Sequence, residues 1–167
     1  YVKSLFRKSV KKNGTVIFNP IGPFNLEKPQ KVEKAIVNVG RLDNQKNQTM
    51  LIKAFSEMCK AFPEYKLYIF GEGHLKHKLE NLINNLNLSE KVFLSGNVSD
   101  IHERILKCEI FVLSSDYEGQ SNALLEAMAL GIPCITTRLP GHEGIVDKDN
   151  TYIIEPGNID QLKTAMV

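Results

Sequence analysis

Two carboxylates, Glu118 and Glu126, are the residues around which a chemical site is most readily predicted. Residues 110–113 (IFVL) predict a buried strand before Glu118, and residues 122–130 are rich in Ala, Leu and Met, which favour a helix. The two carboxylates are therefore expected around the start of a helix that follows a strand. In open α/β sheets such junctions border the crevice that binds ligands, and the free N–H groups of a helix start suit a phosphate.

Glu126 is the only charged residue within 123–130, so the sequence predicts a helix that is buried on nearly every side. A carboxylate in such a place is unfavourable unless it is paired. An ionised carboxylate can accept two hydrogen bonds at once, which suits the vicinal hydroxyls of a sugar. Two simpler alternatives stay open: Glu118 complements the helix dipole, and Glu126 pairs with a Lys or Arg of the core. The Glu-x7-Glu spacing in its strand–loop–helix context favours the ligand site.

The carboxyl ends of the other predicted strands carry cations and glycines. Arg41 and Lys46 follow one strand and could clamp a diphosphate, with ordinary surface cations as the alternative. Gly71 and Gly73 follow the next predicted strand and would allow a ligand to approach the backbone closely. The third glycine of the dinucleotide-binding fingerprint is missing. The backbone at Val98 could contact a base or form an ordinary turn. With the two carboxylates, these features indicate a nucleoside diphosphate that carries a hydroxyl-rich group, which is a nucleotide sugar.

Strands and helices alternate along the chain, which predicts an α/β fold with a doubly wound, mostly parallel, Rossmann-like sheet. Thr49 is the expected N-cap of the first helix, and Ser99 or Asp100 that of the third. Residues 19–31 hold three prolines and no periodicity, so they predict a linker or irregular loop. The expected strands are 15–18, 35–39, 66–70, 92–94, 110–113, 133–137 and 152–154, and the expected helices are 49–60, 74–86, 100–106, 122–130 and one that starts at Asp160.

The composition fits one globular domain with a proper core. The chain has 167 residues, of which 43% are hydrophobic and 24% charged. Its net charge of +2 is too small to indicate a nucleic-acid partner. The basic residues gather near the start, where either a peripheral membrane contact or, more simply, a solvated face is expected; they are Lys3, Arg7, Lys8, Lys11 and Lys12.

Cys59, Cys108 and Cys134 are far apart and odd in number, so they predict neither a metal site nor a disulfide framework. Cys108 and Cys134 lie in apolar stretches and are expected in the core. This usage, together with the lack of a signal peptide and of an apolar run long enough for a bilayer, predicts a cytoplasmic location. Because the chain starts without Met and stops inside a helical pattern, we expect a piece of a longer protein.

As an ordered set, these motifs resemble the C-terminal domain of the family 4 retaining glycosyltransferases, the glycosyl transferases group 1 type with the GT-B fold. The resemblance covers about residues 14–167. It implies that residues 1–31 are a linker that enters from a missing N-terminal domain, and that residues 32–167 form a nucleotide-sugar-binding domain truncated at its C-terminus. The matching motifs are VGRL at 39–42 with Lys46, GEG at 71–73, LSGNV at 94–98, EG at 118–119, LEAM at 125–128, GIP at 131–133 and PG at 156–157.

The resemblance implies a role for each matched residue. Arg41 and Lys46 would bind the donor diphosphate and stabilise the leaving group. Glu118 would contact the donor sugar, Glu126 would hold the ribose hydroxyls, and the backbone of Val98 would meet the base. The other donor-binding residues that it implies are Gly40, Gly71, Gly73, Gly119, Gln120, Ser121, Asn122 and Ala123.

The chain departs from the family pattern in two loops. Residues 120–122 (QSN) stand where many members have Phe-Gly or Met-Pro, which leaves the sugar specificity open. Gly144 stands where many members have a Glu, so Glu143, one residue earlier, is given no role. The four histidines match no catalytic histidine of the family and are expected to be exposed or hydrogen-bonded within the protein; they are His74, His77, His102 and His142.

The resemblance implies a retaining hexosyltransferase with a nucleotide-diphosphate sugar, expected to be a UDP-sugar, as donor, in cell-surface polysaccharide or lipopolysaccharide synthesis. No cofactor and no metal is expected, because the family that the chain resembles normally needs none. A glycan or lipid-linked acceptor would bind the missing N-terminal domain, so the chain alone would bind the donor but hardly transfer its sugar. The alternatives are a non-catalytic α/β interaction module and a sugar-nucleotide epimerase of related architecture.

Overall fold

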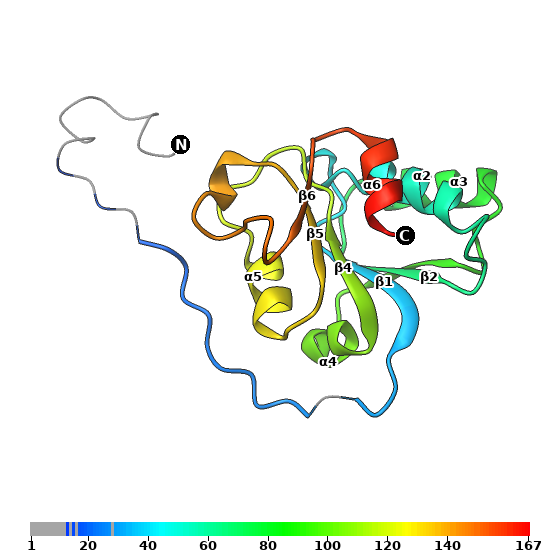
Figure 1. The fold of residues 1–167 in the computed structure, drawn as a ribbon. Helices are drawn as coiled ribbons and strands as arrows, with labels where there is room; N and C mark the ends of the chain where they lie inside the picture. Colours follow the sequence, from blue (N-terminus) through cyan, green and yellow to red (C-terminus); the bar gives the residue numbers. More distant parts are fainter. Residues whose placement is uncertain (1–12, 14, 16, 28) are drawn as a thin grey trace.

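The computed structural model describes residues 13, 15, 17–27 and 29–167. They form a six-stranded sheet in the order β3-β2-β1-β4-β5-β6, with every strand pair parallel and helices on both faces (Figure 1). The predicted doubly wound, Rossmann-like α/β fold is confirmed. The strands are β1 (Glu33–Val39), β2 (Lys66–Phe70), β3 (Val92–Gly96), β4 (Cys108–Leu113), β5 (Cys134–Thr137) and β6 (Tyr152–Ile154). The helices are α2 (Gln48–Met58), α3 (Lys76–Asn85), α4 (Ile101–Leu106), α5 (Asn122–Ala129) and α6 (Ile159–Ala165), with short 3-10 helices η2 (Asn44–Lys46) and η3 (Pro140–His142).

Two hydrophobic cores lie on opposite faces of the sheet. Strand β1 shows why, since successive side chains of a strand point to opposite faces. Ile36 contributes to the core with α2, α3 and α6, whereas Ala35 and Val37 contribute to the core with α4 and α5. All three side chains are fully buried. Because both faces are covered, β1 and β4 are nearly continuous apolar runs rather than alternating ones.

The strand order reverses between β1 and β4. The chain builds β2 and β3 beyond β1, and then β5 and β6 beyond β4. The loops that follow β1 and β4 therefore diverge and open a crevice at the carboxyl edge, which is the usual ligand site of such sheets. The loops with predicted functional residues follow β1, β2, β3 and β4, so the expectation that they share one edge is confirmed.

One helix cap differs from prediction and another agrees with it. The N-cap of α2 is Asn47, not Thr49. Asn47 has a left-handed backbone (φ 46°), which Asn tolerates better than a β-branched residue, and its side chain accepts a hydrogen bond from the Met50 N–H (3.1 Å). The N-cap of α4 is Asp100, one of the two residues predicted for it, although its carboxylate pairs with Arg104 Nε (3.0 Å) and makes no capping hydrogen bond.

Residues 17–27 run as an irregular segment past α5 and α4 toward β1 (Figure 1). The strand predicted at 15–18 is wrong: its described residues 15, 17 and 18 belong to no helix or strand, and Ile17 is 86% exposed instead of covered by a sheet. The basic run at 3–12 lies outside the described residues. In the described part of the chain, no helix combines the length and the apolar character that a bilayer crossing needs.

All three cysteines are buried free thiols, as predicted for Cys108 and Cys134. Burial raises the pKa of both of these thiols to about 12, because their apolar surroundings penalise the thiolate. The thiolate is the reactive form, so both thiols are inert at neutral pH and serve as small core residues.

Candidate functional site

A cleft of about 380 Å³ lies at the carboxyl edge of β1, β2 and β3. Its lining combines apolar side chains, such as Phe70 and Ile101, with the polar groups of Glu72 and Asn97. Size and lining are those of a small-molecule site, in which apolar contact supplies affinity and a few polar groups fix the orientation. The sequence-predicted residues in its walls are Gly40, Arg41, Gly71 and Val98.

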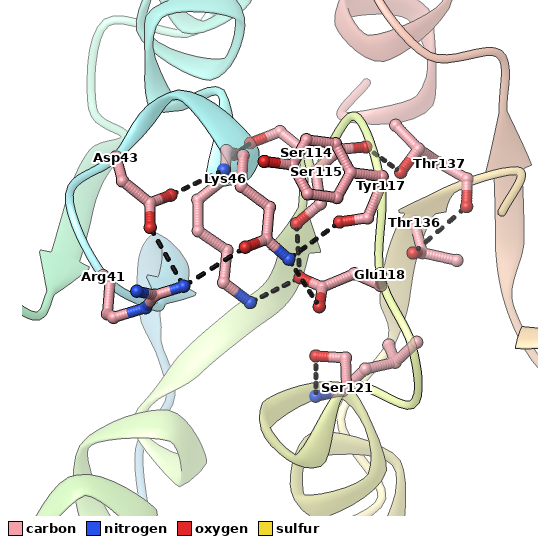
Figure 2. Close-up of polar contacts among 12 residues, drawn as sticks. Arg41, Asp43, Lys46, Ser114, Ser115, Tyr117, Glu118, Ser121, Thr136 and Thr137 are labelled. Atoms are coloured by element: carbon pink, nitrogen blue, oxygen red, sulfur yellow. Dashed lines mark hydrogen bonds and ion pairs between the residues drawn. The ribbon is translucent and has the colours of Figure 1, made fainter. Parts of the chain in front are cut away.

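Lys46 and Glu118 form an ion pair that connects the loops after β1 and β4 (Figure 2). Their side chains are 13% and 8% exposed, so the two charges meet where water scarcely reaches. Glu118 also accepts hydrogen bonds from Ser115 Oγ (2.8 Å) and Gln45 Nε2 (3.3 Å). Such extra bonds are what a nearly buried pair needs, because they satisfy the remaining lone pairs. The sequence predicted both residues for the site, but not their pairing.

The Lys46 side chain is positioned by its own loop. Asp43 caps η2 and accepts a hydrogen bond from the Lys46 N–H (3.1 Å), and Ser114 Oγ donates to the Lys46 carbonyl (2.9 Å). A Cβ atom on Gly40 would lie 3.1 Å from the Cδ and Cε of Lys46. Gly40 therefore supports the site through its missing side chain, which leaves room for the lysine stem.

Arg41 is the exposed cation of the same loop. Its side chain is 73% exposed, and its guanidinium contacts the Asp43 carboxylate and the Gln45 side-chain oxygen, each at 3.2 Å. In Figure 2, Arg41, Lys46 and Glu118 lie on the side of the loop that faces the start of α5. The structure thus gathers the predicted diphosphate-binding cations and one carboxylate at one place, and their contact with a donor stays a prediction.

The start of α5 completes this corner of the site. Ser121 is the N-cap, and its Oγ accepts a hydrogen bond from the Leu124 N–H (3.5 Å). The first N–H groups of a helix have no acceptor within it, so those of Asn122 and Ala123 point out of the helix end with its positive dipole. Gly119 is exposed in the loop just before. This geometry suits the anion binding that the sequence predicted for residues 119–123.

The environment of Glu126 shows that the prediction of an α5 buried on nearly every side is wrong. Within α5 only Leu124 and Ala127 are buried, and the Glu126 side chain is 28% exposed. The helix packs one face against the sheet, and apolar residues elsewhere on it need not be covered. The partner of Glu126 is neither Lys nor Arg: its Oε2 lies 3.1 Å from Nε2 of His102 on α4. His102 is hydrogen-bonded, as expected, but its partner was not predicted.

Gly71 and Gly73 let two loops pass at backbone contact. A Cβ atom on Gly71 would lie 2.0 Å from the Gly40 carbonyl oxygen, and one on Gly73 would lie 2.3 Å from that of Leu42. The Leu42 N–H also donates to the Glu72 carbonyl (3.0 Å). Close packing of the two loops therefore already requires glycine at both positions, whether or not a ligand also approaches them as predicted.

Supporting residues of the site were missed from the sequence. Gln45 and Ser115 hold Glu118, and the buried Asn38 donates from Nδ2 to the Val112 carbonyl (2.8 Å) across the β1–β4 seam. Ser115 is the second residue after the strand predicted at 110–113, so its place at the carboxyl edge was a usable signal. Gln45 and Asn38 offered none, because their partners are more than 70 positions away in the chain.

His142 is neither exposed nor fully hydrogen-bonded, contrary to expectation. It is 2% exposed, its Nδ1 lies 3.4 Å from Thr136 Oγ1, and its Nε2 has no hydrogen-bond partner among the described residues. Burial lowers the pKa of His142 below 6.5, because a charged imidazolium is poorly solvated there. The negative charge of Glu118 opposes this shift and the positive charge of Lys46 adds to it.

We expect the fold to lose stability as the pH falls below the ordinary histidine pKa of 6.5. Below pH 6.5, His142 binds a proton in the unfolded chain but not in the folded one, which favours unfolding. The stability therefore falls from pH 6.5 down to the lower pKa of folded His142, and this effect is absent well above pH 6.5. Thermal unfolding at about pH 7.5 and about pH 5.5 measures it. The drop in melting temperature should be smaller in His142→Gln than in the wild type, because the variant lacks the buried imidazole. Some drop can remain, because the other histidines are present in both proteins. An equal drop would show that His142 makes no contribution.

An all-parallel sheet with a crevice at its strand reversal defines a Rossmann-like domain of the kind found in GT-B glycosyltransferases. The chain belongs to the glycosyl transferases group 1 family, whose sequence model matches residues 24–166. The expected family and fold are thereby confirmed.

Three similar proteins illustrate the family. The N-acetylgalactosamine-N,N'-diacetylbacillosaminyl-diphospho-undecaprenol 4-alpha-N-acetylgalactosaminyltransferase of Campylobacter jejuni is 41% identical over 117 residues, which cover 70% of this chain and 31% of that protein. The poly(glycerol-phosphate) alpha-glucosyltransferase of Bacillus subtilis is 33% identical over 153 residues, which cover 90% and 23%. The crystal structure of TarM from S. aureus with fondaparinux, alpha-GlcNAc-glycerol and UDP has a TM-score of 0.85 at 28% identity and covers 91% and 31%. The chain thus spans less than a third of the length of each of these proteins.

Proposed function

We propose that this chain binds a nucleotide-diphosphate sugar, specifically a UDP-sugar, as the donor of a retaining glycosyltransferase. The observation that carries the proposal is the nearly buried Lys46–Glu118 pair, held across the strand reversal next to the exposed Arg41 and the start of α5. Two cations and a helix N-terminus suit a diphosphate, while carboxylates suit sugar hydroxyls. The complex of TarM with UDP supports the choice of nucleotide.

In this proposal the departing diphosphate is stabilised by Arg41, Lys46 and the first N–H groups of α5. Negative charge that develops on a leaving group is best stabilised by donors already in place, and Lys46 is held in place by its partners. A bound diphosphate would share Lys46 with Glu118, and Glu118 would then accept from hydroxyls of the sugar. Glu126 would hold the ribose, and the cleft beside Val98 would hold the base.

The charge on Arg41 and Lys46 would replace the divalent cation that a free diphosphate usually carries, so we propose binding without a metal. The acceptor, a glycan or a lipid-linked glycan, would be bound by a part of the protein outside this chain. The names of the Campylobacter and Bacillus relatives support such acceptors and a role in cell-surface glycan synthesis. As part of the same proposal, the whole enzyme would be cytoplasmic and would contact the membrane peripherally.

Calorimetry on this chain tests the proposal. We expect UDP to bind more tightly than UMP by about tenfold or more, because the second phosphate meets the cations. Chelation with EDTA should leave the affinity unchanged. Arg41→Ala and Glu126→Ala should each weaken UDP binding by about tenfold, the size of one hydrogen bond that involves a charge. Lys60→Ala is the control, since Lys60 lies just past the end of α2 away from the carboxyl edge. Unchanged binding in both site variants, or a wild type that does not bind UDP, would refute the site.

A further inference from the structure

His102 lies between the Glu126 carboxylate and the segment 17–27. Its Nε2 is 3.1 Å from Glu126 Oε2, and its ring centroid is 4.5 Å from that of Phe24, with the two rings tilted by 46°. Phe24 in turn packs against the core with α4 and α5. The imidazole is therefore held on two sides, although it is 33% exposed and belongs to a short helix.

The segment 17–27 is also tied to the start of α5. The Asn19 N–H donates to Gln120 Oε1 (2.6 Å), and the Asn19 side-chain amide donates to Asn122 Oδ1 (2.8 Å). Gln120 and Asn122 belong to the loop and helix start that the proposed function assigns to the donor. The segment thus reaches the site twice, once at the start of α5 and once through His102 at Glu126.

A carboxylate that recognises two adjacent hydroxyls must present its oxygens in one orientation. A partly exposed Glu on a helix has several rotamers, and selecting one of them on binding lowers the affinity. The contact with His102 selects the rotamer in advance through one lone pair of Glu126 Oε2, and it leaves Oε1 and the second lone pair of Oε2 for the two hydroxyls. It requires a proton on Nε2, which one neutral tautomer and the protonated ring both provide.

We propose that His102 is a positioning residue for ribose recognition by Glu126, and that Phe24 holds His102 in place. This inference rests on the proposed function and deepens it, because it makes the segment 17–27 a part of the donor site. A merely structural role of His102 predicts weaker binding of every ligand. A positioning role predicts a loss that is confined to ligands with both ribose hydroxyls.

The test compares UDP with 2′-deoxy-UDP, which lacks one of these hydroxyls. The wild type should prefer UDP by about tenfold, the size of one hydrogen bond to a charged group. His102→Phe should reduce the preference to about twofold while 2′-deoxy-UDP binds as before. His102→Gln, which can still donate a hydrogen bond, should keep most of the preference, and Phe24→Ala should give an intermediate value. In the double variant with Glu126→Ala, His102→Phe should add no further loss.

His77→Phe is the control, because His77 is also a histidine near a carboxylate, but its partner is Glu80 of the same helix α3 (3.6 Å) and not Glu126. It should leave both affinities unchanged. A tenfold preference that survives His102→Phe, or an equal loss for both ligands, overturns the positioning role. A preference that survives Glu126→Ala overturns the ribose assignment itself, and a wild type that binds neither nucleotide overturns the proposed function.

Discussion

Replacing Lys46 by Met is expected to lower both the stability of the fold and its affinity for UDP. The change removes one partner of a nearly buried ion pair and leaves the Glu118 charge uncompensated, which costs about 3–5 kcal/mol of unfolding free energy. It also removes a charge-assisted contact to the diphosphate, worth about 1.5–3 kcal/mol, or roughly 10- to 150-fold in affinity. Denaturant unfolding measures the first effect, and calorimetry with UDP measures the second.

The double variant Lys46→Met, Glu118→Gln separates these two effects. It leaves no unpaired charge at the site, so its stability should return to within about 1–2 kcal/mol of the wild type. Its affinity for UDP should stay as low as that of the single variant, because the cation is still missing. Lys60→Met is the control: the Lys60–Glu57 pair is exposed and should leave the melting temperature unchanged. A single variant with wild-type stability would contradict a buried pair, and one with wild-type affinity would contradict the phosphate contact.

Gly71→Ala is the second substitution with a large expected effect. The backbone of Gly71 has a φ of 137°, a conformation that L-residues rarely adopt, and a Cβ atom there would lie 2.0 Å from the Gly40 carbonyl oxygen. Strain and clash together should destabilise the fold by about 3 kcal/mol or more, a fall in melting temperature of about 10 °C. The loop that carries Arg41 must also move away, so UDP binding should weaken in the fraction that stays folded.

Gly157→Ala serves as the matched comparison for the backbone effect. Gly157 also has a positive φ, 76°, but nothing lies within 4 Å of the Cβ position. Only the left-handed conformation then opposes the substitution, so the loss should be about 1–2 kcal/mol with UDP affinity unchanged. Equal losses at the two positions would show that the contact with the Gly40 carbonyl is not what requires a glycine at position 71.

The sequence predicted the sheet because its central strands are buried on both faces and therefore appear as apolar runs. The ranges predicted for β2 and β6 match the observed ones residue for residue. The same criterion failed at 15–18, because an apolar run becomes a strand only when a neighbouring strand pairs with it. It also failed for α5, where Ala and Met were counted as buried although one helix face alone packs against the sheet.

The loops that form the site were predictable, whereas the side-chain pairings within them were not. Arg41, Lys46 and Glu118 follow predicted strands, and parallel strands bring such residues to one edge. The pairing of Lys46 with Glu118 depends on β1 and β4 being neighbours, which strand alternation alone does not tell. The contact between Glu126 and His102 likewise depends on how α4 packs beside α5, and neither helix carries a pattern that specifies its neighbour.

The seam between β1 and β4 also governs when this protein can take shape during translation. The hydrogen bond between Asn38 and Val112 spans 74 positions of the chain, and the contact between Lys46 and Glu118 spans 72. Contacts this distant in sequence form late, because closing the intervening loop is entropically unfavourable. The ion pair cannot form until Glu118 has been synthesised. Until then one edge of the apolar strand β1 has no neighbouring strand and is open to chaperones that bind nascent chains.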